Sequence, residues 1–387
     1  MEDYFSPPSL ETVRPLTRSY AGGKDWEIAE FLELLNYAQS IEASDIHLKS
    51  GEPPRIRTVR GLLVPEKKEF KEPVLGSSLN QFISYLERLG TTNDATSLDL
   101  ESTPLEKDGY YDFSVKIANS SMRLSAYRET TGRALAIRFF YNRHVSLEFI
   151  GIPELTPIID RNHGLFMATG PTGGGKTTTL AAMINHLNER ESIHIATLED
   201  PVEYIYTDKR ARITQRNVPA HVSTYEEGLV SIMRQDPDVI LIGELRSFEV
   251  MKTCLLAAES GHLVLTTMHA SSIPHGIHRF ISFFPAHEQN MIRNMLADTL
   301  IGMSNQSLLP STQNKWVLAL ELMIMNTAIA NLIREGKLNA IEDVQRFTSG
   351  MVTWDTRLDT LLLHGLINED TWRRNRRDTQ HPNPLIK

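Results

Sequence analysis

One short segment limits the fold of this chain more than any other. Residues 165–187, LFMATGPTGGGKTTTLAAMINHL, contain the pattern G-x-x-x-x-G-K-T from Gly170 to Thr177. An apolar, strand-like stretch precedes the pattern and a helical pattern follows it. The bare string also occurs by chance, but strand–loop–helix is the setting in which it binds phosphate. The sequence therefore predicts a P-loop core over the alternative of a glycine-rich turn that binds nothing.

The expected ligands of this loop are ATP and Mg²⁺. Its glycines let backbone N–H groups converge on phosphates, and the N-terminus of the following helix adds a favourable dipole. Lys176 is expected to reach the β- and γ-phosphates, and the Thr177 hydroxyl to bind Mg²⁺. The predicted nucleotide-binding residues are Gly170, Pro171, Thr172, Gly173, Gly174, Gly175, Lys176, Thr177 and Thr178.

Three more apolar runs follow the loop and alternate with helical patterns. They are HIATL at 194–198, VILIG at 239–243 and HLVLTTM at 262–268. Short, continuously apolar runs are typical of strands that are buried on both faces of a parallel sheet. Together with LFMAT they predict a doubly wound α/β core. After Pro310 the pattern turns mostly helical, which predicts a helical C-terminal region.

An acidic residue stands at the end of one predicted strand. Glu244 directly follows VILIG, and ligands gather at the carboxyl ends of strands in an open α/β sheet. A carboxylate in that place can orient and deprotonate an attacking water. The alternative is a solvated glutamate at the surface. Asp236 and Asp238 precede the strand and are interpreted as turn and cap residues rather than metal ligands.

The residues before the core follow a different pattern. Helical spacing at 26–43 and 79–90 and alternating segments such as MRLSAYRE and ALAIRFFY predict a small α+β domain. The predicted division is a lead-in at 1–24, the α+β domain at 25–141, a hinge linker at 142–150, the nucleotide-binding core at 151–322 and the helical region at 323–387.

Composition narrows the class of protein. The net charge is −8 and the pI is about 5.9, whereas nucleic-acid binders usually carry a basic face. A single cysteine, Cys254, excludes an internal disulfide and a multi-cysteine zinc site. No apolar run approaches the ~20 residues that cross a bilayer. The chain is expected to be cytoplasmic, with any membrane association arising through partners.

Four motifs in order resemble the type II/IV secretion ATPase superfamily, the hexameric motors of type IV pili and secretion systems. GPTGGGKTTTL resembles its Walker A loop, TLEDPVEY (197–204) its acidic box, MRQDPDVILIGELR its Walker B strand, and AAESGHLVLTTMHASS (257–272) its histidine box. The resemblance runs from about residue 26 to 372. It implies a RecA-like core, a PAS-like N-terminal domain and Mg-dependent ATP hydrolysis.

The same resemblance implies further site residues. Glu199 and Glu203 are expected near the metal and the attacking water, with Glu199 as a metal ligand beside Thr177. His262 and His269 are expected to sense or position the γ-phosphate. From chemistry alone, a lone histidine in an apolar strand is more often a core residue. His269 is the stronger candidate because it follows its strand towards the sheet edge.

Arginines of the first domain are candidates for stabilising the transferring phosphoryl group from outside the nucleotide-binding core. Arginine stabilises charge on a transferring phosphoryl group when a neighbouring domain or subunit supplies it. Arg123 and Arg138 best match the region that closes over the nucleotide in the family; the alternative is surface charge on exposed strands. The predicted catalytic residues are Glu244, Glu199, Glu203, His262, His269, Arg123 and Arg138.

The sequence leaves undecided which cellular machine this motor would drive. The segments ASDIHL and AIANLIREGK (328–337) resemble the pilus-retraction motors, and the tail resembles both these and the Dot/Icm-type (type IVB) secretion and conjugation ATPases. Ser247 stands where the family usually has aspartate, and Ala330 where the retraction motif usually has arginine. These departures favour the transfer or secretion branch over pilus retraction. We expect a homo-hexameric motor that acts with inner-membrane platform or secretion-complex proteins and binds no nucleic acid directly. The alternatives are a pilus-retraction motor proper, an assembly factor with little turnover, and a nucleic-acid translocase.

Overall fold

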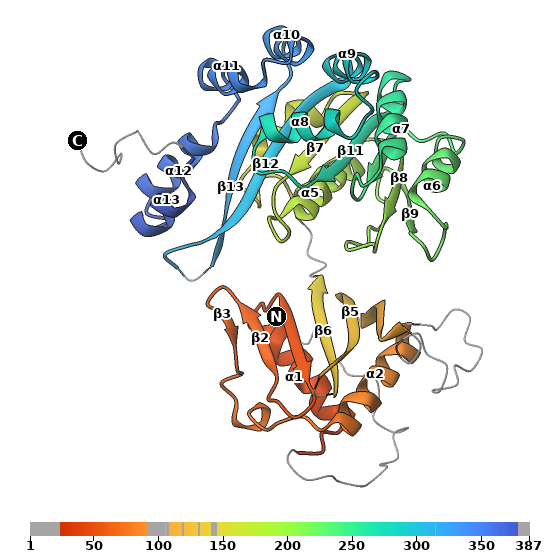
Figure 1. The fold of residues 1–387 in the computed structure, drawn as a ribbon, viewed down its shortest axis with the longest axis vertical. Helices are drawn as coiled ribbons and strands as arrows, with labels where there is room; N and C mark the ends of the chain where they lie inside the picture. The colour runs from red at the N-terminus through yellow and green to blue at the C-terminus, as the bar shows by residue number, and fades with distance from the viewer. Residues whose placement is uncertain are drawn as a thin grey trace. The chain divides into compact units, whose positions relative to one another are not determined.

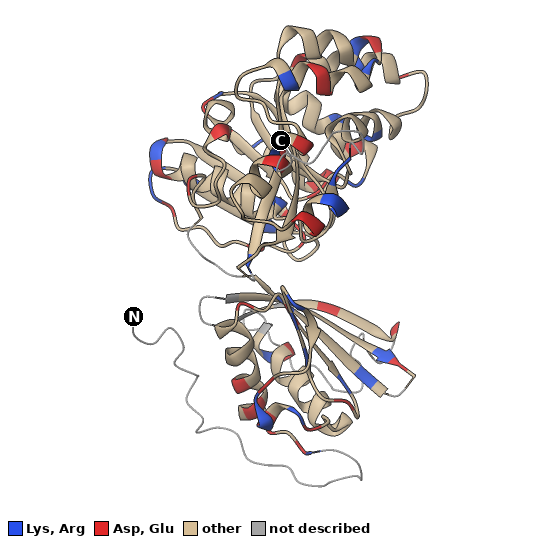
Figure 2. Ribbon diagram, turned by 90° about the vertical axis from the view of Figure 1, so that its left-hand side faces the viewer, with Lys and Arg blue, Asp and Glu red and all other residues tan. Residues whose placement is uncertain are grey.

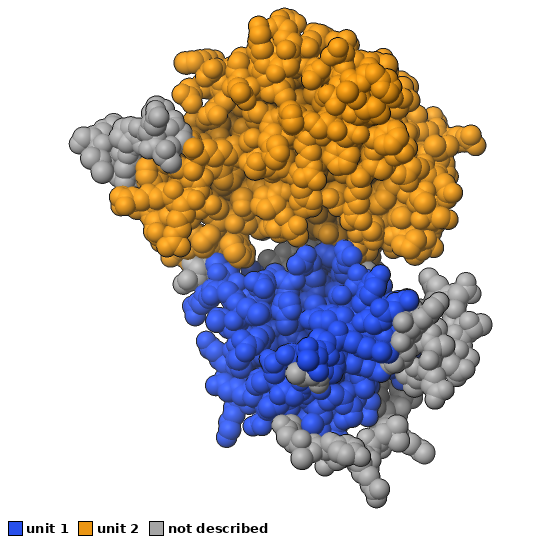
Figure 3. Space-filling view, viewed as in Figure 1, with its two compact units in different colours: residues 1–142 blue, residues 143–387 orange. Residues whose placement is uncertain are grey.

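The chain divides into two compact units, residues 1–142 and 143–387, which Figure 3 shows in different colours. In both units, lysine and arginine positions are interspersed with acidic ones (Figure 2). Of the predicted lead-in, all but Lys24 lies outside the described residues, as do 142–144 of the predicted hinge. The computed structural model describes residues 24–90, 105, 108–117, 120–130, 132–140, 145–313 and 315–377.

The first unit contains one antiparallel sheet, in the order β3-β2-β1-β6-β5-β4 among the residues described. Two helices lie against one face of this sheet (Figure 1). This is the small α+β arrangement that the sequence predicts. The elements are α1 (Ile28–Ser40), β1 (Asp45–Lys49), β2 (Arg55–Thr58), β3 (Gly61–Leu63), α2 (Gly76–Gly90), β4 (Tyr110–Ile117), β5 (Ser120–Glu129) and β6 (Gly132–Phe140).

The core of the first unit lies between the helices and the sheet. Ile46 and Leu48 of β1 are buried in it, and the rings of Phe31 and Phe82, one from each helix, stack with centroids 4.3 Å apart. Because side chains alternate along a strand, Asp45 and the other odd-numbered residues of β1 belong to the opposite face of the sheet.

The second unit contains a larger sheet, in the order β13-β12-β7-β11-β10-β8-β9 within the described part of the chain. All four predicted strands are confirmed: β7 (Gly164–Thr169), β8 (His194–Glu199), β10 (Val239–Ile242) and β11 (Leu263–Met268) are neighbours, and they pair in parallel. Two strands that were not foreseen, β9 (Arg212–Asn217) and β12 (Leu300–Pro310), extend the parallel sheet on either side.

Helices cover both faces of this sheet (Figure 1). Along β7, Leu165 and Met167 are buried in one core and Phe166 and Ala168 in the other. Continuous burial explains the continuously apolar sequence of the central strands. One face packs against α4 (Thr156–Ile159) and α5 (Lys176–Arg190), and the other against α6 (Tyr225–Ile232), α7 (Phe248–Glu259), α8 (Ile273–Ser282), α9 (Gln289–Thr299), α10 (Thr327–Glu335) and α11 (Ile341–Phe347).

The expectation that the chain turns mostly helical after Pro310 is wrong for the first part of that stretch. Trp316–Ile324 forms β13, which pairs antiparallel with β12 and closes that edge of the sheet. Helices follow only from Thr327 onward. The last two, α12 (Trp354–Leu363) and α13 (Glu369–Asn375), form a small core with Leu309 and Ala319 of the two strands.

The predicted fold class, an α/β protein with a helical C-terminal region, is confirmed. Within the described ranges, no helix combines the length and the apolar character that a bilayer crossing requires. The carboxyl ends of β7, β8, β10 and β11 meet at one edge of the sheet because these strands are parallel neighbours, and it is there that the phosphate loop, Glu199, Glu244 and His269 lie.

Candidate active site

The phosphate loop joins the end of β7 to the start of α5. Gly170, Gly173 and Gly175 have positive φ angles of 140°, 74° and 85°, a region that side chains disfavour. At Gly170 a Cβ atom would also lie 2.1 Å from the backbone oxygen of Gln306. The loop therefore needs glycine at Gly170 for two reasons, its backbone angle and the strand behind it.

That supporting strand is β12, and its role was not foreseen. The side-chain amide of Gln306 donates to the Gly174 carbonyl at 3.1 Å and to the Thr179 hydroxyl at 3.0 Å. Beside it, the amide of Asn305 donates to the Thr169 hydroxyl at 3.0 Å and to the Ala270 carbonyl at 2.9 Å. Both side chains are buried, so they form a fixed wall behind the loop.

Lys176 begins α5 and lies inside the loop. Its ammonium donates to the carbonyl oxygens of Gly170 at 3.0 Å and Pro171 at 2.8 Å. Burial lowers the pKa of Lys176, and the charges of Glu244 and Glu203 oppose that change. The Lys176 ammonium and the Glu244 carboxylate therefore lie close enough to interact electrostatically within one site.

His269 lies between the loop and that carboxylate. Its Nδ1 is 3.2 Å from the Gly170 carbonyl oxygen, and its Nε2 is 3.3 Å from Oε1 of Glu244. The loop, His269 and Glu244 thus come from the ends of β7, β11 and β10, which are adjacent in the sheet. A chain of contacts joins the predicted phosphate-binding and water-activating groups.

Glu244 has a second partner that the sequence did not single out. Arg246 donates from Nε to Oε2 of Glu244 at 3.0 Å and from Nη1 to Asp200 at 3.2 Å. The carboxylate is held from both sides, by His269 on one oxygen and by Arg246 on the other. The Glu244 side chain remains a quarter exposed, so a small reactant can reach it.

Glu199 ends β8, next to β10. It is buried, and its Oε1 accepts a hydrogen bond from the Thr197 hydroxyl at 2.7 Å. Burial raises the pKa of Glu199 to about 7; the charge of Glu203 adds to this effect, and hydrogen bonds from Thr197 and Gln215 oppose it. A Cβ placed on Gly243 would lie 3.4 Å from the Glu199 Cα, so the ends of the two strands are in close contact.

His262 does not join this group. It precedes β11, where its Nδ1 lies 3.0 Å from the Ala257 carbonyl and 3.1 Å from the Ser260 hydroxyl. The whole length of β11 separates it from His269, about 20 Å at the usual rise of ~3.3 Å per residue. The structure therefore does not bring His262 together with the phosphate loop, and its predicted role in sensing or positioning the γ-phosphate stays a prediction.

The predicted arginines lie in the first unit, on neighbouring strands. Arg123 of β5 and Arg138 of β6 stand opposite each other in the sheet. Arg138 donates from Nε to Asp45 at 2.8 Å, and Arg123 lies 3.7 Å from Asp112. About half of each arginine side chain is exposed. Their predicted action on a nucleotide stays a prediction.

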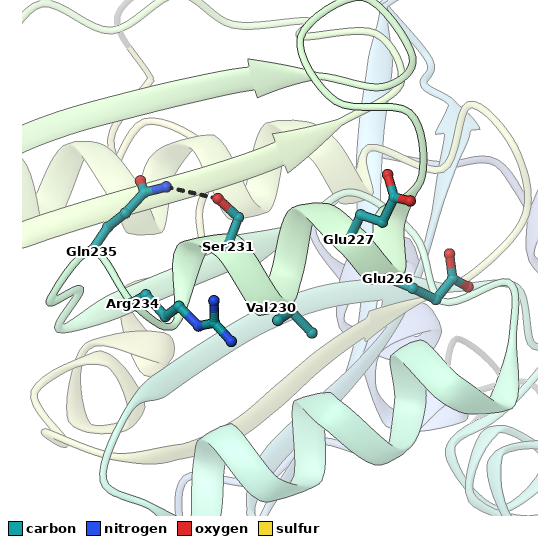
Figure 4. A pocket seen from close by; sticks show the side chains of 6 residues that line it. All are labelled: Glu226, Glu227, Val230, Ser231, Arg234 and Gln235. Carbon is teal, nitrogen blue, oxygen red and sulfur yellow. Dashed lines mark hydrogen bonds between the residues drawn. The ribbon is translucent and has the colours of Figure 1, made fainter.

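Two other features of the core have local explanations. Ser247 caps the N-terminus of α7 by accepting from the Val250 amide, and its hydroxyl donates to Glu226 at 2.6 Å. A shallow groove along α6, in which the Gln235 amide donates to Ser231 at 3.2 Å, contains none of the predicted site residues (Figure 4). Its lining residues are Glu226, Glu227, Val230, Ser231, Arg234 and Gln235.

Comparison with known proteins decides the family. The family model described as type II/IV secretion system protein matches residues 31–344. The chain belongs to this family. The chain is 38% identical over 326 residues to the uncharacterized protein YggR of Escherichia coli, covering 83% of this chain and 95% of YggR. It is 36% identical over 351 residues to the type IV pilus retraction ATPase PilT of Pseudomonas aeruginosa, covering 89% and 97%.

Solved structures of family members support the same conclusion. The crystal structure of the pilus retraction motor PilT with bound ADP superposes with a TM-score of 0.77 at 33% identity, covering 90% of this chain and 97% of that one. The ATPase DotB of Legionella pneumophila also gives 0.77, at 22% identity with 90% and 95% covered, which shows a shared fold. The predicted superfamily, the RecA-like core and the enzyme class of P-loop ATPase are confirmed.

Proposed function

We propose that this protein binds Mg-ATP at residues 170–178 and hydrolyses it as a hexameric motor for a type IV pilus or secretion machine. The observation that carries the proposal is the position of His269, 3.2 Å from the Gly170 carbonyl and 3.3 Å from the Glu244 carboxylate. Through it, the group that holds phosphate and the group that activates water belong to one site.

The outer side of the loop is open to a nucleotide. A Cβ on Gly173 would meet nothing within 4 Å, so the outer side of the loop is open, and Thr172 and Gly173 are exposed. The backbone N–H groups at the N-terminus of α5, together with the helix dipole, favour the binding of phosphate. The solved relative PilT was crystallised with ADP, which supports a nucleotide at this site.

Each residue of the site has a proposed task. Lys176 exchanges its carbonyl partners for phosphate oxygens, and Glu244 accepts the proton of the attacking water while Arg246 and His269 hold its carboxylate. Thr177 and Glu199 would hold Mg²⁺, which supplies charge neutralisation on the phosphates. Glu203 lies close enough to act electrostatically on both Lys176 and Glu199.

Replacement of the proposed base tests hydrolysis. We expect Glu244→Gln to bind ATP normally but to turn over about 10²–10⁴-fold more slowly, because the amide cannot accept the proton. Steady-state phosphate release and nucleotide binding are the two measurements. Glu249→Gln is the matched control, since Glu249 is an exposed glutamate in the first turn of α7. Undiminished hydrolysis by Glu244→Gln would remove Glu244 from the mechanism.

Ser247 does not favour the alternative of an assembly factor with little turnover. Ser247 accepts from the Val250 amide as an N-cap side chain does, and its hydroxyl also donates to Glu226. Serine and aspartate are both good N-caps, so the start of α7, three residues after Glu244, is formed with serine as well. Hydrolysis remains the better supported function.

The comparisons favour a pilus-type machine over the Dot/Icm-type branch. In the structural superpositions, identity to PilT is 33% and identity to DotB is 22%, with 90% of this chain covered in both. We propose that the protein acts in the cytoplasm against inner-membrane platform proteins, without contacting nucleic acid. In the proposed ring, Arg123 and Arg138 act on the nucleotide of a neighbouring subunit. Size-exclusion chromatography with and without a non-hydrolysable ATP analogue tests the ring, and a monomer under both conditions would contradict it.

A further inference from the structure

The chain returns to the core after its last helix. Arg377, two residues beyond α13, donates from Nη1 to Glu321 of β13 at 2.6 Å and from Nη2 to the Asn305 side-chain oxygen of β12 at 2.7 Å. The same Nη2 also donates to the Ser271 carbonyl. One guanidinium therefore joins three segments of the ATPase core.

Two of these acceptors lead directly to the active site. Ser271 lies two residues after His269, and Asn305 donates both to the Ala270 carbonyl and to the Thr169 hydroxyl, the residue before the phosphate loop. Arg377 is thus one hydrogen bond away from the loop that carries His269, and two from the start of the phosphate loop.

The surroundings of Arg377 hold it in place. Glu321 is 2% exposed; burial raises its pKa, and the charge of Arg377 opposes that change. The guanidinium lies over the Trp354 ring at 4.7 Å, and the Arg377 amide donates to Asp355 at 3.1 Å. A buried carboxylate needs a paired cation, so the geometry favours this one position of the arginine.

We propose that Arg377 is a positioning residue of the ATPase site, which fixes residues 269–271 so that His269 meets both Gly170 and Glu244. This rests on the proposed hydrolysis. Arg377 lies beyond residues 31–344, the part matched by the family model. The helices α12 and α13, which precede Arg377, pack on the outer strands β12 and β13. Through Arg377, the helical C-terminal region is therefore connected to the segment that carries His269.

A substitution of Arg377 alone would mix two effects. Arg377→Met keeps an unbranched side chain against Trp354 but leaves Glu321 buried without its cation, which destabilises the fold. The double variant Arg377→Met/Glu321→Gln removes the unpaired charge of Glu321. It still lacks the guanidinium hydrogen bonds to Ser271 and Asn305. Stability and positioning are thereby separated.

We expect the double variant to regain most of the melting temperature lost in Arg377→Met, yet to keep a kcat roughly ten- to hundred-fold below wild type, because a misplaced catalytic group is that costly. Nucleotide Kd should stay within about two-fold, since residues 170–178 are unchanged. Glu321→Gln alone retains the arginine and should keep a kcat near wild type.

Arg376→Ala is the matched control. Arg376 pairs with Asp359 and Asp355 and stacks on Trp372, all in the helical C-terminal region, so its loss should lower the melting temperature with kcat unchanged. The inference is overturned if kcat of the double variant recovers together with its melting temperature, or if kcat falls equally in Arg376→Ala. Absence of turnover in wild type would overturn both the proposed function and this inference. If wild type turns over ATP, the outcomes above overturn this inference alone.

Discussion

The two ends of β11 carry the same residue type in opposite surroundings. At the carboxyl end, His269 lies between the phosphate loop and Glu244, and two fifths of its side chain is exposed. At the amino end, His262 contacts the Ala257 carbonyl and the Ser260 hydroxyl at the end of the preceding helix. The first histidine faces groups that a ligand can rearrange, whereas the second completes a local turn.

The direction of a parallel strand decides which of the two residues that flank it lies at the site. In a parallel sheet all carboxyl ends lie at one edge, so β7, β8, β10 and β11 bring the loop, Glu199, Glu244 and His269 together although 100 residues of sequence separate them. A residue before a strand belongs to the other edge, whatever motif it shares with the residue after it.

Substitution of each histidine by asparagine should give the largest difference between the two ends of β11. We expect His269→Asn to lower kcat by about 10²–10³-fold, because a group aligned with the reacting centre is lost. His262→Asn is the matched variant and should keep kcat within about two-fold while losing on the order of 1 kcal/mol of unfolding free energy through its hydrogen bonds. Equal losses of kcat in both variants would contradict the division between the two ends.

The buried carboxylate at the end of β8 gives the next effect. The pKa of Glu199 is about 7 in the folded protein against an ordinary value of 4.5, so the folded state binds this proton more tightly than the unfolded state. The contribution of Glu199 to stability should therefore be fully present below pH 4.5 and be lost as pH rises through 7, by about 3 kcal/mol in all, from 2.5 pH units at ~1.36 kcal/mol each.

Glu199→Gln removes this titration. The difference in unfolding free energy between the variant and wild type should shift by about 3 kcal/mol in favour of the variant between pH 4.5 and pH 8. Urea unfolding of nucleotide-free protein at several pH values measures it. Parallel stability curves for the two proteins would show that Glu199 is not held in a proton-retaining environment.

The phosphate loop and Glu244 could be predicted from the sequence because both depend on local order along the chain. A strand, a glycine loop with Lys176 and a helix occupy consecutive residues, and Glu244 directly follows its strand. The four central strands were equally clear, since burial on both faces places apolar residues at consecutive positions along each of them.

The rest depends on contacts between distant segments. Gln306 and Asn305 lie within a strand whose buried polar residues interrupt the apolar pattern, so β12 has no strand signature although it supports the loop. Trp316–Ile324 is apolar at every position except Glu321, and such a run does not distinguish a strand from a helix. Arg377 is one of 40 basic residues, and only its contacts with Glu321, Asn305 and Ser271 single it out.

The position of bound nucleotide decides whether the phosphate loop, Glu244 and His269 form a single site. A crystal structure of Glu244→Gln with ATP and Mg²⁺ should show the γ-phosphate between the Lys176 ammonium and residue 244, with His269 beside it. A γ-phosphate that lies away from residue 244 and His269, in contact with the loop alone, would contradict a single site at the carboxyl end of the sheet.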